Sequence, residues 1–262
     1  MFDNSPILED FKFRVKYIMK TNTFPVVLDD TFMLSPSVKH FSFISKQDFN
    51  YIPGQFITLH FEQEGKTFRR SYSIANPPEN NNRIEFAAGY VPDGPGTNLL
   101  FNLQVGDELQ INGPFGRLIL KEASPKRYVL IATSTGVTPF RAMLPELEKR
   151  MLANAELKCV IMLGVQKRED ILYNKEFQHW AERLKPQLDF QAYLSRETAT
   201  NLEPRENKGY VQSGFETLNL NPLEDVVYLC GNPAMIDDSF EKLKDLGFTT
   251  QNIIREKYIS SK

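Results

Sequence analysis

The sequence is poor in the residues from which metal and redox centres are usually built. Its 262 residues include two cysteines and three histidines. Cys159 and Cys230 lie in separate apolar segments, and the four clustered cysteines that an iron–sulfur cluster needs are missing. His40, His60 and His179 are scattered along the chain. We therefore expect no metal site, no disulfide framework and a reducing, cytoplasmic location.

Long apolar runs and an excess of one charge are also absent. No run approaches the roughly 18–20 apolar residues that cross a bilayer, and residues 1–6 have neither the basic start nor the apolar core of a secretory signal. The chain has 31 basic and 33 acidic residues, a balance that argues against nucleic acid as the main partner. An apolar fraction of 41% and a charged fraction of 24% fit a globular protein long enough for two domains.

Short apolar strands separated by turn signals occupy residues 30 to about 122. The expected strands are 32–34, 40–44, 55–61, 83–88, 108–111 and 117–120. Regular short strands without strong helices predict a small antiparallel barrel or sandwich. Residues 1–29 fit a strand and a helix equally well, and we expect them to form an extension that packs against the body of the protein.

The pattern changes near residue 124. Continuous apolar runs at 128–132, 157–163, 188–194 and 226–230 alternate with helical patterns at 140–152, 174–184 and 235–246. Such runs predict parallel strands that are covered on both faces. Residues 124–262 are therefore expected to form a doubly wound α/β domain that binds ligands at the carboxyl ends of its strands.

One extended segment carries an unusual set of side chains. Arg70-Ser-Tyr-Ser73 follows an alternating strand and is closed by Asn76-Pro-Pro78. In a strand Arg70 and Tyr72 share one face, so that an arginine fork for a phosphate stands beside a ring able to stack on another ring. Taken alone, the tetrapeptide is better explained as an exposed strand end.

A turn at the end of the first apolar run suits a phosphate ligand. Ala132-Thr-Ser-Thr-Gly-Val-Thr-Pro139 lacks the G-x-G-x-x-G fingerprint of many dinucleotide sites. Gly136 nevertheless lets backbone N–H groups approach a pyrophosphate at the start of a helix. An ordinary turn capped by Thr138 explains this loop equally well.

A second loop offers positive charge where sites for NAD offer a carboxylate. Ser195 and Arg196 end one apolar run, and Lys208 and Tyr210 follow a polar loop. These groups suit a 2′-phosphate, with Tyr210 stacked on an adenine ring. A solvated loop of mixed charge explains Lys208 alone.

Taken in order, these motifs resemble the ferredoxin–NADP reductase family over residues 30–258, nearly the whole chain. R-x-Y-S is the flavin signature of that family, T-G-x-T-P its nucleotide loop, and C-G-x-x-x-M, here Cys230 to Met235, its third motif. The resemblance implies an α+β chain of two domains. Residues 30–123 would form an antiparallel Greek-key β-barrel that binds FAD, and residues 124–262 a doubly wound parallel sheet that binds NADP(H).

The resemblance also assigns residues to FAD. It implies that Arg70 binds a phosphate, that Tyr72 stacks on the isoalloxazine and that Ser73 hydrogen-bonds near flavin N5. The implied FAD-binding set is Arg70, Ser71, Tyr72, Ser73, Ala88, Gly89, Tyr90, Pro95, Gly96, Thr97 and Thr138.

The implied NADP-binding set is Thr135, Gly136, Val137, Ser195, Arg196, Lys208, Tyr210, Gly231, Asn232 and Met235, with Glu197 pointing away. The implied catalytic group is Tyr72, Ser73, Cys230, Glu256 and Tyr258. In it Cys230 shapes the hydride-transfer geometry without acting as a nucleophile, and Glu256 handles a proton. Tyr258 covers the flavin, although this chain continues four residues beyond it where plant-type members end.

We therefore expect an FAD-dependent reductase that exchanges electrons between NADPH and a separate one-electron carrier, a ferredoxin or flavodoxin. Such carriers are acidic, so Lys66, Arg69, Lys121 and Arg127 are candidates for a basic docking rim. A monomer without nucleic acid or membrane span is expected. The alternatives are the reductase component of an oxygenase, an NAD(P)H:flavin reductase, and a redox-silent nucleotide-binding regulatory subunit.

Overall fold

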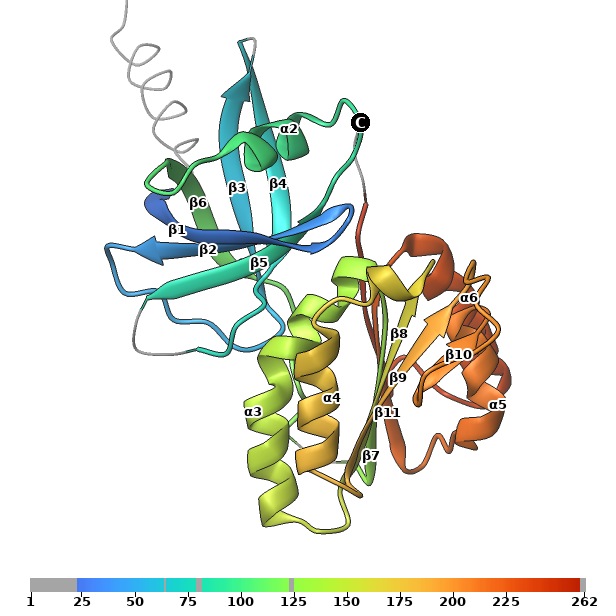
Figure 1. The fold of residues 1–262 in the computed structure, drawn as a ribbon. Coiled ribbons are helices and arrows are strands. Elements are labelled where there is room, and N and C mark those ends of the chain that lie inside the picture. The colour runs from blue at the N-terminus through green and yellow to red at the C-terminus, as the bar shows by residue number, and fades with distance from the viewer. Residues whose placement is uncertain (1–22, 64, 79–81, 123–124, 260–262) are drawn as a thin grey trace, which may run out of the picture.

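The computed structural model describes residues 23–63, 65–78, 82–122 and 125–259. These residues form two six-stranded sheets that follow one another along the chain, the first antiparallel and the second parallel (Figure 1). The expected fold class is thereby confirmed. The alternatives for residues 1–22 lie outside the described residues. No helix in the described ranges is long and apolar enough to cross a membrane.

The antiparallel sheet has the strand order β4-β3-β6-β1-β2-β5. Its strands are β1 (Phe24–Ser35), β2 (Val38–Ser45), β3 (Phe56–Gln63), β4 (Lys66–Ser73), β5 (Arg83–Gly89) and β6 (Glu108–Phe115). The sheet curls until its two edges meet, because the Tyr72 ring of β4 stacks on the Phe86 ring of β5 with centroids 4.7 Å apart. Phe41 and Phe43 stack on the same ring from β2. The result is a barrel with an aromatic core.

The first strand differs from the expectation. β1 begins at Phe24, so residues 24–29 belong to the barrel and not to the expected extension. Val26 and Leu28 are buried in the core. The pairing with β2 shifts register between Leu28 and Asp30, and such a bulge breaks the apolar–polar alternation by which a strand is recognised.

Two further segments of this half were predicted wrongly. Helix α2 (Pro95–Asn102) lies in a region expected to hold only strands and contacts both β4 and β5. Residues 117–120 form no strand. Instead the Tyr228 hydroxyl donates to Ile119 O at 3.1 Å and accepts from Lys121 N–H at 3.0 Å, which ties this connection to the second sheet.

The parallel sheet has the order β10-β9-β8-β7-β11-β12. Its strands are β7 (Arg127–Thr133), β8 (Lys158–Val165), β9 (Leu188–Leu194), β10 (Glu206–Lys208), β11 (Asp225–Gly231) and β12 (Ile253–Lys257). The four apolar runs expected as strands are confirmed as β7, β8, β9 and β11. The edge strands β10 and β12 were not predicted, because they are short and largely polar.

Helices cover both faces of this sheet (Figure 1). They are α3 (Thr138–Ala153), α4 (Asn174–Arg183), α5 (Phe215–Leu218) and α6 (Pro233–Asp245), with short 3-10 helices η1 (Ser134–Val137), η2 (Arg168–Asp170) and η3 (Val211–Gly214). In β7, Tyr128, Leu130 and Ala132 join the apolar cluster of α3 and α4, whereas Val129 and Ile131 join that of α5 and α6. This double burial explains why the run is apolar throughout.

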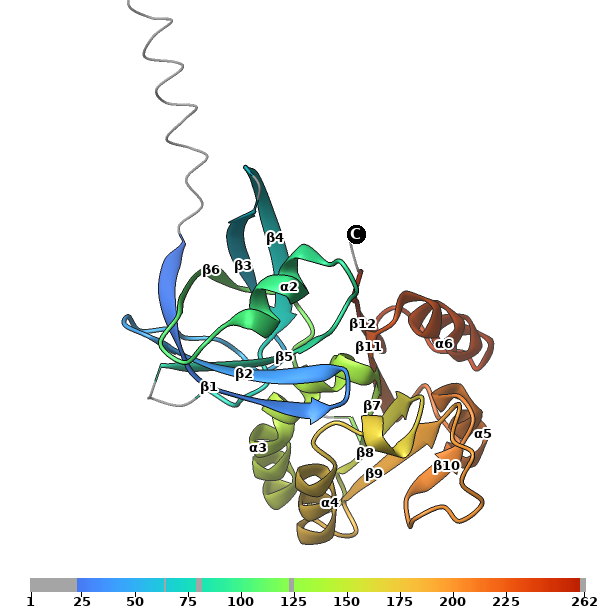
Figure 2. The ribbon, with the colours of Figure 1, turned by 45° about the horizontal axis from the view of Figure 1, so that its top comes forward.

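The chain leaves β7 toward β8 on one side and later returns to β11 on the other. This reversal creates a switch point between β7 and β11, where open α/β sheets bind their ligands. The two views of the ribbon place the barrel over this end of the sheet (Figures 1 and 2). We propose a domain boundary at residues 123–124, between β6 and β7.

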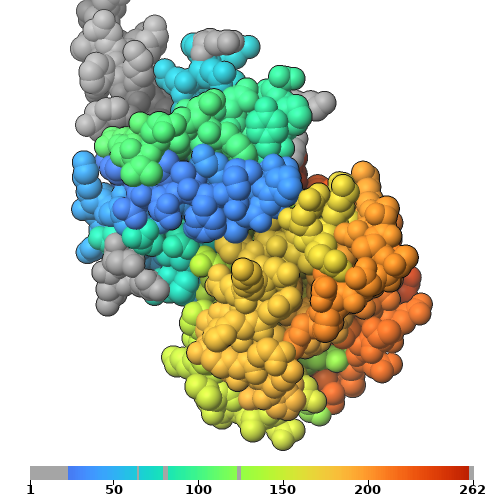
Figure 3. All heavy atoms as spheres, in the orientation of Figure 1, coloured from blue at the N-terminus to red at the C-terminus, as the bar shows by residue number. Residues whose placement is uncertain are grey.

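The two sheets are packed against each other. Val38 and Ala87 of the barrel belong to the apolar cluster that contains Phe140 of α3. The space-filling view shows β1 and β2 directly above the region of η2 and α4 (Figure 3). At this contact His40 is 3% exposed and its Nδ1 lies 2.9 Å from the Tyr173 hydroxyl. Burial lowers the pKa of His40 to about 4, against a smaller opposing effect of Glu85.

We expect the protein to lose stability through His40 as the pH falls from 6.5 toward 4. An imidazole in the unfolded chain takes up its proton near pH 6.5, whereas His40 in the fold does so only near pH 4. The unfolded state therefore binds more protons in this window, and the free energy of unfolding falls by up to about 3 kcal/mol. Urea denaturation of the wild type and of His40→Gln, at about pH 7.5 and about pH 5, measures the effect. The variant should lose less stability on acidification, and an equal loss contradicts the assignment.

Candidate active site

The R-S-Y-S segment ends β4 with its side chains on alternate faces. Arg70 and Tyr72 are half-buried, whereas Arg69 and Ser71 are exposed. Gly96, in the first turn of α2, packs against the first pair: a Cβ there would lie 3.0 Å from Arg70 Cγ and 3.3 Å from the Tyr72 hydroxyl. Glycine thus lets the start of α2 approach an arginine, and the two together fit a phosphate group.

Tyr72 is held as a neutral ring. One of its faces stacks on Phe86, so a flavin ring would stack on the opposite face. Burial raises the pKa of Tyr72 to about 12, although the neighbouring Arg70 acts in the other direction. The phenol therefore stays protonated at physiological pH and offers an uncharged surface for stacking.

The next residue, Ser73, lies in a polar cluster that joins the two sheets. Its hydroxyl donates to Glu256 Oε1 at 3.1 Å and accepts from the Tyr258 hydroxyl at 2.5 Å. The Tyr258 hydroxyl also lies near the Cys230 thiol, and each of these groups shifts the pKa of the other. Four of the five residues expected in the catalytic group thus meet, although they lie up to 185 positions apart.

The ends of two parallel strands position this cluster. Cys230 and Glu256 are direct neighbours in the pairing of β11 with β12, and the Tyr258 N–H donates to Gly231 O at 2.8 Å. The turn after β7 packs on the same place, because a Cβ on Gly136 would lie 2.3 Å from the Cys230 carbonyl oxygen. A residue larger than glycine at position 136 would push this turn away from the cluster.

Burial disfavours the charged forms of the ionisable groups of the cluster. It raises the pKa of the Cys230 thiol and of the Tyr258 phenol well above their ordinary values. Nearby Glu256 raises both pKa values further. Cys230 also raises the pKa of Tyr258, whereas Tyr258 lowers that of Cys230. Burial also raises the pKa of Glu256, while the hydrogen bond from Ser73 opposes this rise. Cys230 is therefore a neutral thiol and unsuited to act as a nucleophile.

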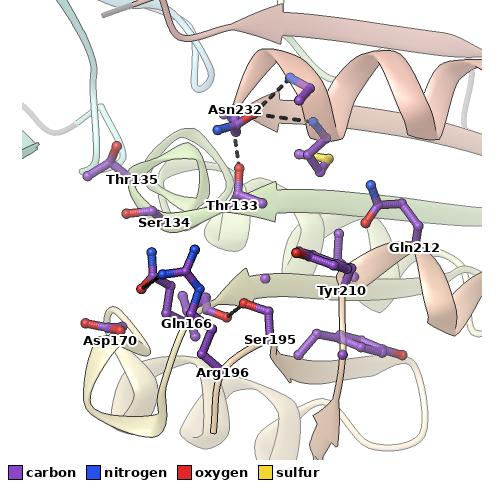
Figure 4. Close-up of a pocket in the computed structure, with 18 of the residues that line it drawn as sticks. Thr133, Ser134, Thr135, Gln166, Asp170, Ser195, Arg196, Tyr210, Gln212 and Asn232 are labelled. Atoms are coloured by element: carbon purple, nitrogen blue, oxygen red, sulfur yellow. Dashed lines mark hydrogen bonds between the residues drawn. The ribbon is translucent and has the colours of Figure 1, made fainter.

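A cleft of about 960 Å³ opens at the carboxyl ends of β7, β8, β9 and β11. Thr133, Thr135, Ser195, Arg196 and Asn232 line it from the loops that follow these strands (Figure 4). The β1–β2 turn closes it from the barrel side. Tyr258 lines the same cleft, so the cleft reaches the cluster around Ser73.

The cleft presents a cation, Arg196, at the carboxyl end of β9. Arg196 lies there with its Nη1 3.4 Å from Gln166 Oε1, and Ser195 Oγ donates to Val165 O at 3.1 Å. The Glu197 carboxylate is turned away, because it accepts hydrogen bonds from the backbone N–H groups of Arg168 and Ala199. These bonds lower its pKa and hold it charged outside the cleft lining.

Comparison with known proteins identifies the family. Residues 25–119 match the model of the oxidoreductase FAD-binding domain, and residues 130–240 match that of the oxidoreductase NAD-binding domain. The chain is 30% identical over 210 residues to a ferredoxin--NADP reductase of Azotobacter vinelandii, a match that covers 74% of this chain and 78% of that protein. The chain belongs to the ferredoxin–NADP reductase family.

Two further relatives show the range of this family. Reductase component 1 of terephthalate 1,2-dioxygenase from a Comamonas species is 26% identical, over 79% of this chain and 59% of that protein. The crystal structure of a ferredoxin NADP+ reductase from Neisseria gonorrhoeae, with bound FAD and NADP, superposes with a TM-score of 0.79 at 22% identity, covering 91% of this chain and 99% of that one. This member of the family is thus an FAD- and NAD(P)-binding oxidoreductase.

Some residues expected to bind cofactors have structural roles in this reductase. The Thr138 hydroxyl donates to Thr135 O at 2.8 Å, and it does not cap α3, whose N-cap is Val137 and has no side-chain cap hydrogen bond. The Thr97 hydroxyl is turned into its own loop, within 2.9 Å of Val91 O and 3.1 Å of Gly94 O. The Asn232 side chain caps α6 by accepting from the N–H groups of Ala234 and Met235. Each of these three side chains thus has a backbone hydrogen-bond partner, and its contact with a cofactor stays a prediction.

Some of the remaining expected residues line the cleft, and the others lie outside its lining. Tyr210, Gly231 and Met235 line the cleft, and Tyr210 is 74% exposed there. Gly136, Val137 and Lys208 are not among the described residues of the lining. Three others surround the flavin motif: Ala88 is buried in the barrel core, Gly89 ends β5, and Pro95 begins α2. The Tyr90 ring is half-exposed and packs edge-on against Phe101.

Sequence reasoning missed Gln212 and the barrel side of the cleft. Gln212 Nε2 donates to Asp238 Oδ2 at 2.9 Å, while its Oε1 is buried without a hydrogen-bond partner among the described residues. Such an acceptor in a nucleotide cleft suits an amino group such as that of adenine. Its position two residues after Tyr210 is a sequence signal from which Gln212 could have been predicted as a cleft residue. Ser35, Ser37 and Val38 gave none, because only the packing of the two sheets brings them to the cleft.

We expect Arg70→Ala to weaken FAD binding by roughly 10- to 100-fold, since a charge-assisted hydrogen bond to a phosphate contributes about 1.5–3 kcal/mol. Fluorescence titration of the flavin-free protein with FAD measures the dissociation constant. Arg69→Ala is the matched control, because Arg69 is the exposed neighbour on the opposite face of β4. If both variants bind FAD as the wild type does, Arg70 is not the phosphate anchor.

Proposed function

We propose that this reductase transfers electrons between NADPH and a ferredoxin or flavodoxin, and that it acts as a cytoplasmic monomer. The observation that carries the proposal is the cluster of Ser73, Cys230, Glu256 and Tyr258, where the flavin motif of the barrel meets the nucleotide cleft. Both cysteines are free and buried, which is consistent with a reducing compartment.

Bound FAD supplies the chemistry, since a flavin takes up a hydride from nicotinamide and releases electrons singly. The chain supplies binding and orientation. Arg70 and the first turn of α2 hold the phosphates, while Tyr72, backed by Phe86, supports the ring. Ser73 offers a hydroxyl beside the reacting edge and donates to Glu256, a carboxyl group whose pKa is raised by burial. Tyr258 fills the space between Ser73 and the cleft and excludes water from it.

The nucleotide is proposed to be NADPH. Arg196, Ser195 and nearby Lys208 provide donors and positive charge for a 2′-phosphate, which carries a charge of about −2 at neutral pH. The carboxylate of Glu197, which could bind a free 2′-hydroxyl, is occupied with backbone N–H groups outside the cleft. Tyr210 offers its exposed ring to the adenine.

Arg196→Glu should raise the KM for NADPH by roughly 10- to 100-fold, because a charge-assisted hydrogen bond is replaced by repulsion of the 2′-phosphate. The KM for NADH, which lacks that phosphate, should change little. Lys185→Glu makes the same change in charge beyond the far end of α4, where Lys185 pairs with Glu182, and it controls for long-range electrostatics. Equal effects of Arg196→Glu on both nucleotides would remove the 2′-phosphate assignment.

The electron acceptor is proposed to be a separate protein, because the chain lacks the cysteines for a cluster of its own. Lys66 and Arg69 on β4 are exposed and remain candidates for the docking rim. Arg127 is withdrawn, because it forms a fork with Asp225 at the end of β7 away from the cleft. Lys121 is withdrawn as well, since its ammonium group binds Gln251 O at the start of the loop into β12.

A reductase component of an oxygenase is the second candidate, favoured by the Comamonas relative, of whose length this chain spans 59%. Anaerobic stopped-flow absorbance separates the two functions. The purified protein is mixed with NADPH and then with flavodoxin, with ferredoxin, or with free flavin as a control. We expect bleaching of the flavin and fast reoxidation by one of the carrier proteins. Bleaching without reoxidation by either carrier excludes the proposed acceptors, and a protein that NADPH cannot bleach excludes the proposed donor.

A further inference from the structure

One guanidinium group bridges the two sheets behind the catalytic cluster. Arg141 of α3 donates through Nη1 to Glu85 Oε2 at 2.7 Å and to Ala75 O at 3.0 Å, both in the barrel. Through Nε it donates to both carboxylate oxygens of Glu176 in α4, at 3.0 and 2.8 Å. Its side chain is 18% exposed. The same fork thus holds two carboxylates and a backbone carbonyl from three elements.

Two aromatic residues complete this arrangement. The guanidinium carbon of Arg141 lies 4.8 Å from the centre of the Tyr173 ring. The Tyr173 hydroxyl contacts Nδ1 of His40, whose Nε2 lies 3.7 Å from Glu85 Oε2. The contacts therefore close a ring in which His40, Ala75 and Glu85 come from the barrel and Arg141, Tyr173 and Glu176 from the α/β half. A planar group with several donors is needed at its centre, and lysine cannot make the same set of bonds.

The bridged segments carry the two half-sites. Ala75 is two residues beyond Ser73, whose hydroxyl belongs to the catalytic cluster. Arg141 stands in the first turn of α3, directly after η1, whose Thr135 lines the nucleotide cleft and whose Gly136 packs on Cys230. The bond from Arg141 to Ala75 O therefore fixes the end of the flavin motif relative to the nucleotide loop by a short and rigid path.

We propose that Arg141 is a positioning residue for hydride transfer, which sets the separation of the flavin and nicotinamide seats through Ala75 and Glu85. The proposal rests on the hydride transfer described under the proposed function. It assigns Arg141 no contact with either cofactor. Hydride transfer needs the reacting atoms about 3–3.5 Å apart, and a displacement of about 1 Å can slow such a step by about 100-fold.

The test compares Arg141→Lys with a matched control, Arg127→Lys. Arg127 also forms a fork with a carboxylate, Asp225, and also donates to a backbone carbonyl, Leu218 O. Its side chain is 22% exposed, close to the value for Arg141. All its partners lie within the α/β half, at the opposite end of β7 from the cleft. The two substitutions therefore remove similar packing and hydrogen bonding, but only Arg141→Lys changes a contact between the two sheets.

Four quantities are measured for the wild type and both variants: the thermal midpoint, the FAD content, the affinity for 2′-AMP, and the rate of flavin reduction by saturating NADPH. The long-wavelength absorbance of the flavin–nicotinamide complex reports ring stacking separately. We expect Arg141→Lys to bind FAD and 2′-AMP as the wild type does, yet to reduce its flavin about 10- to 100-fold more slowly with weaker stacking absorbance. Arg127→Lys should lose thermal stability and retain the rate.

Glu85→Gln and Glu176→Gln test the two carboxylate contacts of Arg141 separately. Glu85 crosses between the sheets and Glu176 does not, so Glu85→Gln should slow reduction more than Glu176→Gln. If Arg141→Lys and Arg127→Lys retain equal rates and equal stacking absorbance, the positioning role is wrong and Arg141 only stabilises the fold. If the wild-type flavin is not reduced by NADPH or NADH, the proposed function fails and the positioning inference fails with it.

Discussion

Hydride transfer requires two flat rings in contact, and this chain provides the seat of each ring on a different sheet. The reaction therefore depends on a fixed position of the two sheets relative to each other. Apolar packing of Val38 and Ala87 on the α3 side excludes water from the junction, while Tyr228 ties down the connecting segment. Apolar packing is not directional, and the two hydrogen bonds of Tyr228 hold the connecting segment and not the two binding sites. The directional contacts are polar ones, Ser73 with Glu256 and Arg141 with Ala75 and Glu85.

The electrostatics of the site follow from the same burial. Cys230, Tyr258 and Glu256 all have raised pKa values because desolvation penalises their charged forms. The site therefore presents a hydroxyl group, a thiol and a carboxyl group whose charged form is disfavoured by burial. Positive charge lies at Arg70 and Arg196, the two residues proposed to bind the cofactor phosphates. Groups whose charged forms are disfavoured thus lie near Ser73, and the arginines lie apart from them. This arrangement suits a reaction in which the cofactor itself undergoes the bond changes.

Much of this arrangement could be predicted from sequence, and the failures have a physical pattern. The apolar runs of β7, β8, β9 and β11 predicted a buried sheet, and the structure confirms it. Ser73, Glu256 and Tyr258, which the motifs grouped with Cys230, do lie together, while their catalytic roles stay predictions. The local hydrogen bonds of Thr97, Thr138 and Arg127 could not be predicted, because a short polar side chain or a guanidinium group binds whichever backbone group or carboxylate the fold brings nearest. The residues that line the cleft from the barrel could not be predicted, because only the packing of strands far apart in the sequence brings them there.

The placement of Tyr258 connects the cluster around Ser73 with an edge of the parallel sheet. Tyr258 follows β12, an edge strand with a single hydrogen-bonded neighbour, and it is held by one backbone bond to Gly231 O and by its hydroxyl. Under the proposed function, a nicotinamide that reaches Ser73 through the cleft would have to displace this ring. Strand ends open more easily than the centre of a sheet, so we expect the displacement to be local and to leave the two sheets in place. Nucleotide entry would then depend on the residue that directly follows β12.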